Sequence, residues 1–153
     1  MKRLVVIAHA PSSNTRAMVD AVLDGAGDEA IENVSIRHVR PLDARAQDAL
    51  EADAIIFGTT ENLGYMSGAL KDFFDRCFYD LVDKTDAKPY GVFIRAGKDG
   101  TGTRRAIESI CGGLNWKPVQ EPLICRGQWD EGFLDQCREL GMAMAAGLEA
   151  EIF

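Results

Sequence analysis

The sequence predicts an α/β fold: a three-layer, doubly wound sandwich with a five-stranded parallel sheet between two layers of helices. Along the 153 residues, short apolar runs alternate five times with segments of helical periodicity, a pattern typical of parallel sheets covered on both faces. Three of the apolar runs are unbroken, as in buried central strands, whereas the other two have features of edge strands. Placing those two at the edges gives the strand order 2-1-3-4-5.

The five strands are predicted from apolar runs bounded by polar residues. The three central strands are Leu4–Ile7, Ala54–Phe57 and Tyr90–Ile94. In Val34–Val39 the apolar residues alternate over most of the segment, so this strand is expected to bury one face only. Val119–Cys125 contains Pro122, which cannot donate a hydrogen bond to a neighbouring strand, and this predicts the second edge.

Helices are predicted between and after these strands, where apolar residues recur at helical spacing. They are expected over Asn14–Leu23, Asp43–Leu50, Met66–Asp80, Thr103–Leu114 and Phe133–Leu148. No repeat, linker or low-complexity tract interrupts the pattern, so we expect one domain over residues 1–153.

Composition and charge exclude several classes of protein. The net charge is −7, which argues against a nucleic-acid partner and against a surface for anionic membranes. The apolar run Leu4–Ala8 is too short for the core of a signal peptide, and no run approaches the ~20 residues of a membrane span. Four cysteines without C-x-x-C spacing and two histidines give no zinc pattern, so no metal is expected. We therefore expect a soluble, cytoplasmic protein with reduced, buried cysteines.

The predicted topology also predicts where a ligand binds. In a doubly wound sheet, ligands occupy the crevice beyond the carboxyl ends of the strands, where the strand order reverses. Three loops flank that crevice, and they are called the first, second and third loops: His9–Thr15, Thr59–Ser67 and Arg95–Thr103.

The first loop predicts an anion site. Its hydroxyl and amide side chains stand at the start of a helix, where free backbone N–H groups and the helix dipole favour a phosphate. Its candidate residues are His9, Pro11, Ser12, Ser13, Asn14 and Thr15. Alternatively, Ser13 or Asn14 serves only to cap the helix, and His9 has a structural role. The chain has no Walker lysine and no G-x-G-x-x-G, which disfavours a P-loop or a classical dinucleotide site.

The second loop carries a resemblance to a known family. The run from Gly64 to Asp75 is similar to a Gly-x-Met-Ser-Gly-x-Leu-Lys-x-Phe-x-Asp pattern of FMN-binding flavodoxin-like proteins, especially the NAD(P)H-dependent FMN reductases and quinone reductases. The first loop resembles their phosphate loop, with Ser12, Asn14 and Thr15 in the matching places, although Ser13 stands where glycine is common. The resemblance implies that the second loop lies against the isoalloxazine ring.

The candidate residues of the second loop follow from this resemblance. They are Thr60, Glu61, Asn62, Leu63, Gly64, Tyr65 and Met66. For Tyr65 and Met66 the alternative is a place in the core at the start of a helix. Glycines at 64 and 68 suit a backbone that passes close to a ligand.

The third loop supplies the remaining candidates. In the family resembled, a glycine-rich loop after the fourth strand meets the flavin, which implies contacts from Arg95, Ala96, Gly97, Lys98 and Gly100. The segment from Arg95 to Arg105 has four basic residues and one acid in a chain of net charge −7. We expect Arg95 and Lys98 to meet an anion there.

The resemblance implies an FMN-containing oxidoreductase that takes electrons from NAD(P)H and passes them to a quinone, a flavin or a similar small acceptor. Flavin cofactors supply the redox chemistry, so no catalytic side chain is assigned. A single compact anion site favours FMN over FAD, and the family implies a homodimer. Two alternatives stay open, because fold alone does not fix function: a flavodoxin-type one-electron carrier and a flavin-free binding module.

Overall fold

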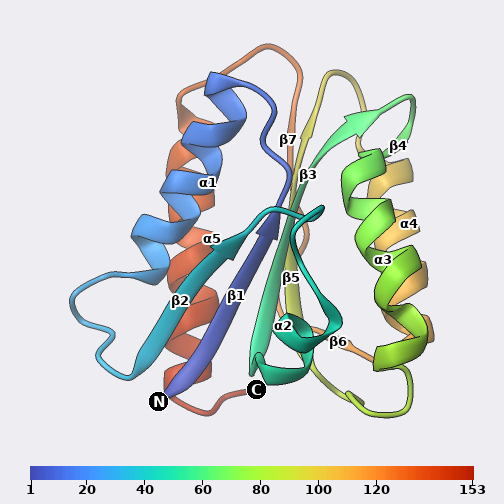
Figure 1. Ribbon diagram of the computed structural model, residues 1–153. Helices are drawn as coiled ribbons and strands as arrows, with labels where there is room; N and C mark the ends of the chain where they lie inside the picture. The colour runs from blue at the N-terminus through green and yellow to red at the C-terminus, as the bar shows by residue number, and fades with distance from the viewer.

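The parallel sheet has the predicted strand order. The computed structural model describes residues 1–153, and its strands lie in the order β2-β1-β3-β5, with the fifth place shared by β6 and β7 (Figure 1). Their bounds are Lys2–Ala8 for β1, Val34–Val39 for β2, Ala54–Asn62 for β3, Pro89–Ala96 for β5, Lys117–Pro118 for β6 and Leu123–Arg126 for β7. The flavodoxin-like order 2-1-3-4-5 is therefore confirmed.

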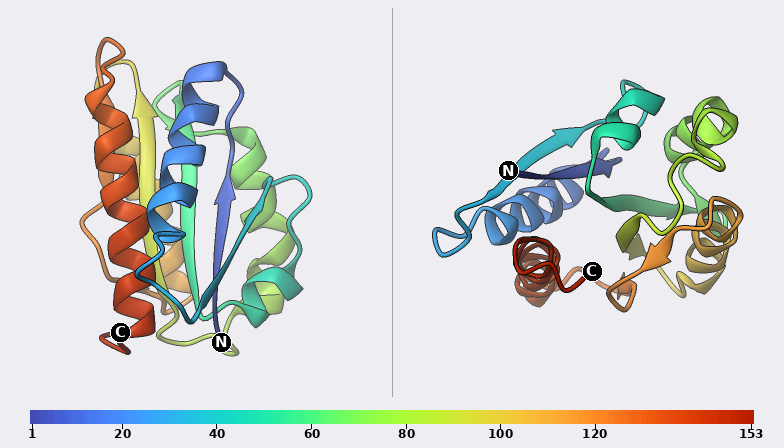
Figure 2. Two further views of the ribbon diagram at one scale, coloured as in Figure 1. Left: turned by 90° about the vertical axis from the view of Figure 1, so that its left-hand side faces the viewer. Right: turned by 90° about the horizontal axis from the view of Figure 1, so that it is seen from below.

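Two layers of helices cover the sheet, as Figure 2 shows in the view from below. Helices α1 (Ser13–Ala26) and α5 (Gly132–Glu149) pack together on one face. Helices α2 (Ala46–Glu51), α3 (Gly68–Leu81) and α4 (Thr101–Gly113) cover the other face. The arrangement is the predicted three-layer sandwich.

Each face of the sheet has its own hydrophobic core. Along β1, Val5 and Ile7 belong to the core under α3 and α4, whereas Leu4 and Val6 belong to the core under α1 and α5. This alternation explains why the central strands are unbroken apolar runs, since side chains of a strand point to opposite faces in turn.

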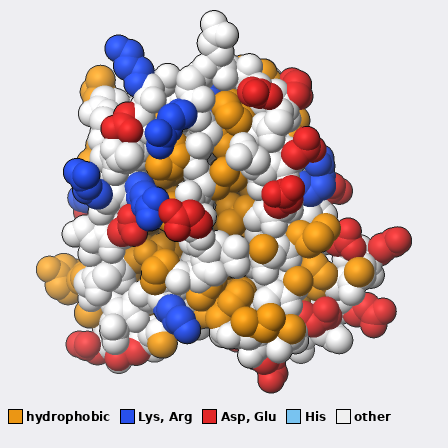
Figure 3. Space-filling model, turned by 180° about the vertical axis from the view of Figure 1, so that it is seen from behind, with side chains coloured by type: hydrophobic (Ala, Val, Ile, Leu, Met, Phe, Trp, Pro, Cys, Tyr) orange, Lys and Arg blue, Asp and Glu red, His pale blue; other side chains and the backbone are white.

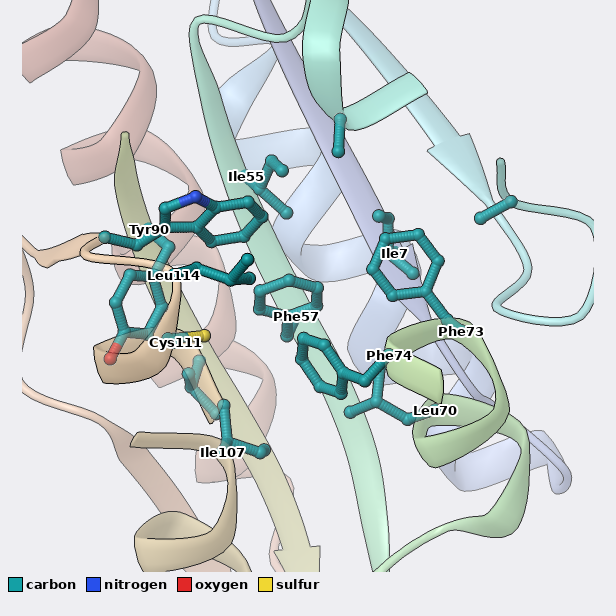
Figure 4. Packing of buried hydrophobic residues seen from close by; sticks show 14 of the residues in the cluster. Ile7, Ile55, Phe57, Leu70, Phe73, Phe74, Tyr90, Ile107, Cys111 and Leu114 are labelled. Atoms are coloured by element: carbon teal, nitrogen blue, oxygen red, sulfur yellow. The ribbon is translucent and has the colours of Figure 1, made fainter. Parts of the chain in front are cut away.

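The core under α3 and α4 is built around one aromatic ring. The ring of Phe57 lies 5.1 Å from that of Phe74 and stacks at 6.0 Å on the indole of Trp116, centroid to centroid (Figure 4). Truncation of such a buried ring to alanine costs about 3–5 kcal/mol of stability. The core therefore fixes β3, and with it the start of the second loop.

The second loop is a hairpin, which the sequence did not indicate. Strand β3 continues past Phe57 to Asn62, and a two-residue strand β4 (Tyr65–Met66) pairs with it in the antiparallel sense. The helix predicted from Met66 therefore begins later, at Gly68, where the Ser67 hydroxyl caps it by accepting from the Leu70 N–H at 3.2 Å.

Two other elements differ from prediction. The fifth strand is split, because Pro118 and Pro122 lack the N–H that a continuous ladder needs, and Pro122 lies outside both β6 and β7. Helix α2 begins at Ala46 rather than at Asp43. Its first residues are replaced by turns in which the N–H groups of Asp43 and Ala44 donate to the Arg40 carbonyl, both at 3.0 Å.

Candidate functional site

The three loops lie together at the carboxyl ends of the strands, which is the upper end of the sheet in Figure 1. The first loop joins β1 to α1, the second contains the hairpin of β3 and β4, and the third joins β5 to α4. The first loop is attached to β3 by the His9 N–H, which donates to the Gly58 carbonyl at 2.9 Å.

The first loop begins with a capping box made by Ser12 and Thr15. The Ser12 hydroxyl accepts from the Thr15 N–H at 3.1 Å, and the Thr15 hydroxyl accepts from the Ser12 N–H at 2.9 Å. Ser12 is therefore the helix cap, and the alternative of a cap by Ser13 or Asn14 is wrong. Both of those side chains are exposed, as is Pro11, and no intramolecular hydrogen bond occupies Ser13 or Asn14.

The start of α1 suits a phosphate. The first N–H groups of a helix have no acceptor within the helix, and here those of Ser13 and Asn14 are left open. The first turn contains no acidic residue, so nothing opposes the field of the helix dipole. The donor set is therefore that of an anion site, and the residues present fit the phosphate of FMN.

His9, the first residue of this loop, is half-buried. Burial lowers its pKa, because desolvation penalises the charged imidazolium. Near pH 7 the ring is therefore neutral, and it acts as a hydrogen-bonding group rather than as a cation.

The second loop turns sharply at its tip. Leu63 and Gly64 have φ of 54° and 77°, the positive values that a two-residue hairpin turn requires. The pairing places Met66 opposite Glu61 and Tyr65 opposite Asn62. Met66 is 2% exposed and belongs to the core, so the core interpretation is correct for it, whereas Tyr65 is 40% exposed and open to a ligand.

Two buried hydroxyls that sequence analysis did not select anchor this hairpin. The Thr59 hydroxyl donates to the Ser67 hydroxyl and accepts from the Ser67 N–H, both at 3.0 Å. Above them, the Thr60 hydroxyl donates to the Asn62 side-chain oxygen at 2.9 Å. Thr59 and Ser67 are the first and last residues of the second loop. Two hydroxyl residues at the ends of a loop were the feature of the sequence that could have indicated this hydrogen bond.

The hairpin packs against the start of α4, which joins the second loop to the third. The Glu61 carboxylate accepts from the buried Thr103 hydroxyl at 3.0 Å. A Cβ on Gly102 would lie 2.6 Å from the Gly64 carbonyl oxygen, so the close approach requires glycine. Glu61 therefore has a structural partner, and the two loops form one wall.

The third loop combines a fixed end with an open middle. Gly100 has φ 84° and its Cβ would lie 2.5 Å from Ile124, so it is required by the fold. A Cβ on Gly97 would meet nothing within 4 Å, and Lys98 is exposed. Ala96 is fully buried, so only its backbone can serve a ligand.

Arg95 corrects one prediction. Its guanidinium donates to the carbonyl oxygens of Ala96, Cys125 and Gly127 at 2.7, 3.0 and 2.7 Å. It also lies over the rings of Trp129 and Phe133, at 5.9 and 5.2 Å from their centroids. Because its donors are engaged beneath the loop between β7 and α5, the side chain has a structural role. Lys98 is the cation that the third loop presents to solvent.

Other features of the chain fall outside the three loops. All four cysteines are free thiols and are buried, as predicted. No helix has the length and apolar character needed to cross a bilayer.

Comparison with known proteins identifies the family. Residues 1–130 match the NADPH-dependent FMN reductase family. The chain belongs to this family. The resemblance noted in the first and second loops is thereby confirmed, and membership in an FMN reductase family supports FMN as the cofactor.

Individual relatives of this FMN reductase family member include flavodoxins. A flavodoxin of Aquifex aeolicus (strain VF5) is 33% identical over 110 residues, which are 72% of this chain and 58% of the relative. The chain thus spans less than two thirds of that protein. A flavodoxin from the domain Archaea has a TM-score of 0.78 at 21% identity, covering 97% of this chain and 99% of its own. The flavodoxin, WrbA-like protein of Agrobacterium tumefaciens has a TM-score of 0.74 at 22% identity, with 99% of each chain covered.

Proposed function

We propose that the chain is an FMN-dependent oxidoreductase that takes electrons from NAD(P)H and passes them to a small acceptor such as a quinone or a free flavin. The observation that carries the proposal is the start of α1, where open N–H groups and the exposed Asn14 amide stand in a turn without acids. The family match over residues 1–130 supports the same conclusion. FMN, when bound, supplies the transfer of hydride and electrons.

The residues of the three loops then have separate tasks. The N–H groups of Ser13 and Asn14 bind the phosphate, and Lys98 adds positive charge from the third loop. Tyr65 contacts the ring from the hairpin, and the open space at Gly97 lets the backbone approach it closely. Thr59 and Glu61 hold the hairpin in position and do not contact the ligand.

A second candidate is a one-electron carrier. The 33% identity with the Aquifex aeolicus flavodoxin favours it. The exposed Lys98 of the third loop disfavours it, because negative charge near the ring is what opposes full reduction and keeps a carrier's potential low.

The test is anaerobic reduction of the purified protein. We expect a yellow protein whose cofactor, released by heat, is identified as FMN by mass spectrometry. Its visible absorbance should bleach on addition of NADH or NADPH. Turnover is then measured as NAD(P)H consumption with a quinone or free FMN. Bound FMN that neither nicotinamide reduces would establish the carrier instead, and a protein that binds no FMN would be a flavin-free module.

We also propose that the protein works as a homodimer, as the family resemblance implies. On α3, Phe73 and Phe74 are in the core and are not available to a partner. Tyr79, 84% exposed on α3, and Leu63, fully exposed at the hairpin tip, are two of the large hydrophobic side chains that a second copy could cover.

A further inference from the structure

A cavity of about 400 Å³ lies between the carboxyl ends of β1 and β2, apart from the second and third loops. Its walls come from the end of β1, the first residues of the first loop, α1, the end of β2, the segment that follows β2, and the start of α3. In Figure 1 the segment after β2 crosses in front of the sheet on its way to α2. The volume is within the range of small-molecule sites and too small for a macromolecular ligand.

Basic side chains gather around this cavity in an otherwise acidic chain. The lining residues include two arginines, Arg16 and Arg40, against one acid, Asp43, in a protein of net charge −7, together with two histidines, of which His9 is neutral near pH 7. Both histidines of the chain are among them.

The charges of the cavity do not cancel. Asp43 is neutralised by Arg40, whose guanidinium lies 2.7 Å from its carboxylate. Arg16 makes no ion pair and its side chain makes no hydrogen bond, so its guanidinium is the uncompensated charge of the lining.

The rest of the lining is apolar. Ala8, Ala10 and Ala69 supply small side chains, and Leu42 stands at the rim with 64% of its surface exposed. A lining that combines apolar side chains with a free guanidinium suits a ligand that has both an apolar body and an anionic group.

Hydrogen bonds fix two walls of the cavity. Arg76 of α3 donates to the carbonyl oxygens of Pro41 and Ala44, both at 2.9 Å. On the other wall, the His38 imidazole Nε2 lies 3.3 Å from the Ala8 carbonyl oxygen. A ligand therefore enters a formed site and does not have to order a loop, which lowers the cost of binding.

We propose that this cavity is a second ligand site, one for a small organic anion in which a carboxylate or phosphate is attached to an apolar body. The free guanidinium of Arg16 takes the anionic group, and the alanines and Leu42 cover the body. The inference rests on the cavity alone and holds whether or not the protein oxidises NAD(P)H.

The first test is calorimetric titration of FMN-saturated protein with benzoate, phenyl phosphate, benzyl alcohol and inorganic phosphate. We expect one or both of the organic anions to bind at least about tenfold more tightly than the neutral alcohol and than inorganic phosphate. Comparison of the two organic anions identifies the preferred anionic group. The proposal would be overturned if neither organic anion bound more tightly than benzyl alcohol, or if neither bound at about 10 mM.

The second test locates the ligand. Because both histidines line the cavity, the ring proton signals of His9 and His38 in ¹H NMR report directly on it, and a His38→Gln variant assigns them. We expect both signals to move as the bound anion saturates. Signals that stay in place while calorimetry detects binding would place the ligand elsewhere.

Charge variants complete the argument. Arg16→Gln is expected to weaken anion binding by about tenfold or more. Arg105→Gln removes the same charge from an exposed position on α4 that makes no ion pair, and should leave the affinity unchanged. Equal losses of anion affinity in the two variants would show that net charge alone weakens binding, and would overturn the proposal. Release of the anion by FMN would assign the cavity to the cofactor site and overturn the proposal, whereas failure of NAD(P)H to reduce the flavin would affect only the proposed function.

Discussion

Asn14 and Thr15 are neighbours in the first loop, yet their surroundings differ. Thr15 is 6% exposed, and both its N–H and its hydroxyl are bonded to Ser12. Asn14 is exposed, and no other residue of the chain contacts its amide through a hydrogen bond. One side chain therefore stabilises the helix, and the other is available to a ligand.

Substitution of these two residues separates stability from binding. Asn14→Ala should weaken FMN binding by about 1–2 kcal/mol, the scale of a hydrogen bond to a charged group, and leave the urea midpoint almost unchanged. Thr15→Ala should lower the free energy of unfolding by about 1 kcal/mol, since it breaks the capping box. Fluorescence titration with FMN and urea unfolding measure the two effects. Unchanged FMN affinity in Asn14→Ala would remove its amide from the site.

Arg95 and Lys98 allow a similar comparison in the third loop. Arg95→Met removes three hydrogen bonds to carbonyl oxygens, although the Ala96 carbonyl keeps the Gly127 N–H as a donor, so we expect a loss of about 1–3 kcal/mol in the free energy of unfolding. Lys98→Met, at an exposed position, should leave stability within about 0.5 kcal/mol and raise the dissociation constant of FMN. Urea midpoints of both variants are compared with that of the parent protein. Equal stability of the two variants would contradict the structural role of Arg95.

The half-buried His9 should make the free energy of unfolding depend on pH. Burial lowers its pKa, so between the native pKa and the unfolded value near 6.5 the unfolded chain binds more protons than the native one. The stabilisation is therefore complete above pH 6.5 and decreases as the pH falls through this window. Urea unfolding at pH 7.5, 6.5 and 5.5 should show a smaller loss in His9→Gln than in the parent. Parallel curves for the two proteins would exclude His9 as the source.

At the scale of elements, the hairpin and the start of α4 behave as one unit. Gly102 touches the backbone of the hairpin tip, whereas Gly112, near the other end of the same helix, has nothing within 4 Å of its Cβ position. A methyl group at position 102 has to displace the Gly64 carbonyl, because that neighbour is backbone and cannot rotate away. The geometry of the second loop therefore depends on a residue of the third.

A pair of alanine substitutions in α4 tests this dependence. Gly102→Ala should push the hairpin away from α4, and we expect at least about tenfold weaker FMN binding. Gly112→Ala adds the same methyl group in open space, so FMN affinity should not change and stability should rise by up to about 1 kcal/mol. The readouts are FMN titration and thermal unfolding. Equal FMN affinities in the two variants would show that the position of the hairpin does not affect cofactor binding.

Periodicity predicted most elements, and its failures have physical causes. The central strands and the five helices follow from apolar spacing, because burial on both faces leaves a clear pattern. The hairpin at Leu63 and Gly64 was missed since leucine rarely adopts positive φ. The role of Arg95 was predicted wrongly because its carbonyl partners, at Cys125 and Gly127, lie about thirty residues away in sequence. Local patterns do not contain such long-range partners.

For the whole molecule, the sheet edges decide how copies can meet. The edge strands β6 and β7 have two and four residues, and short edges interrupted by proline resist pairing with another sheet. Figure 3 shows the back of the molecule, where hydrophobic side chains gather along the centre between charged ones. Association of two copies through the edge formed by β6 and β7 is therefore disfavoured, whereas the opposite edge strand, β2, has six residues and no proline.

Tyr79 on α3 is the side chain that we expect to anchor a dimer. With FMN bound, sedimentation at micromolar concentration should give twice the chain mass of 16.7 kDa. Tyr79→Ser should raise the dissociation constant of the dimer at least about tenfold, since exposed aromatic side chains are frequent anchors of interfaces. Met142→Ser is the matched control, because Met142 is 38% exposed on α5, in the other helix layer, and its loss should leave the dimer intact. A single species of the chain mass, or equal weakening by both substitutions, would argue that α3 does not form the contact.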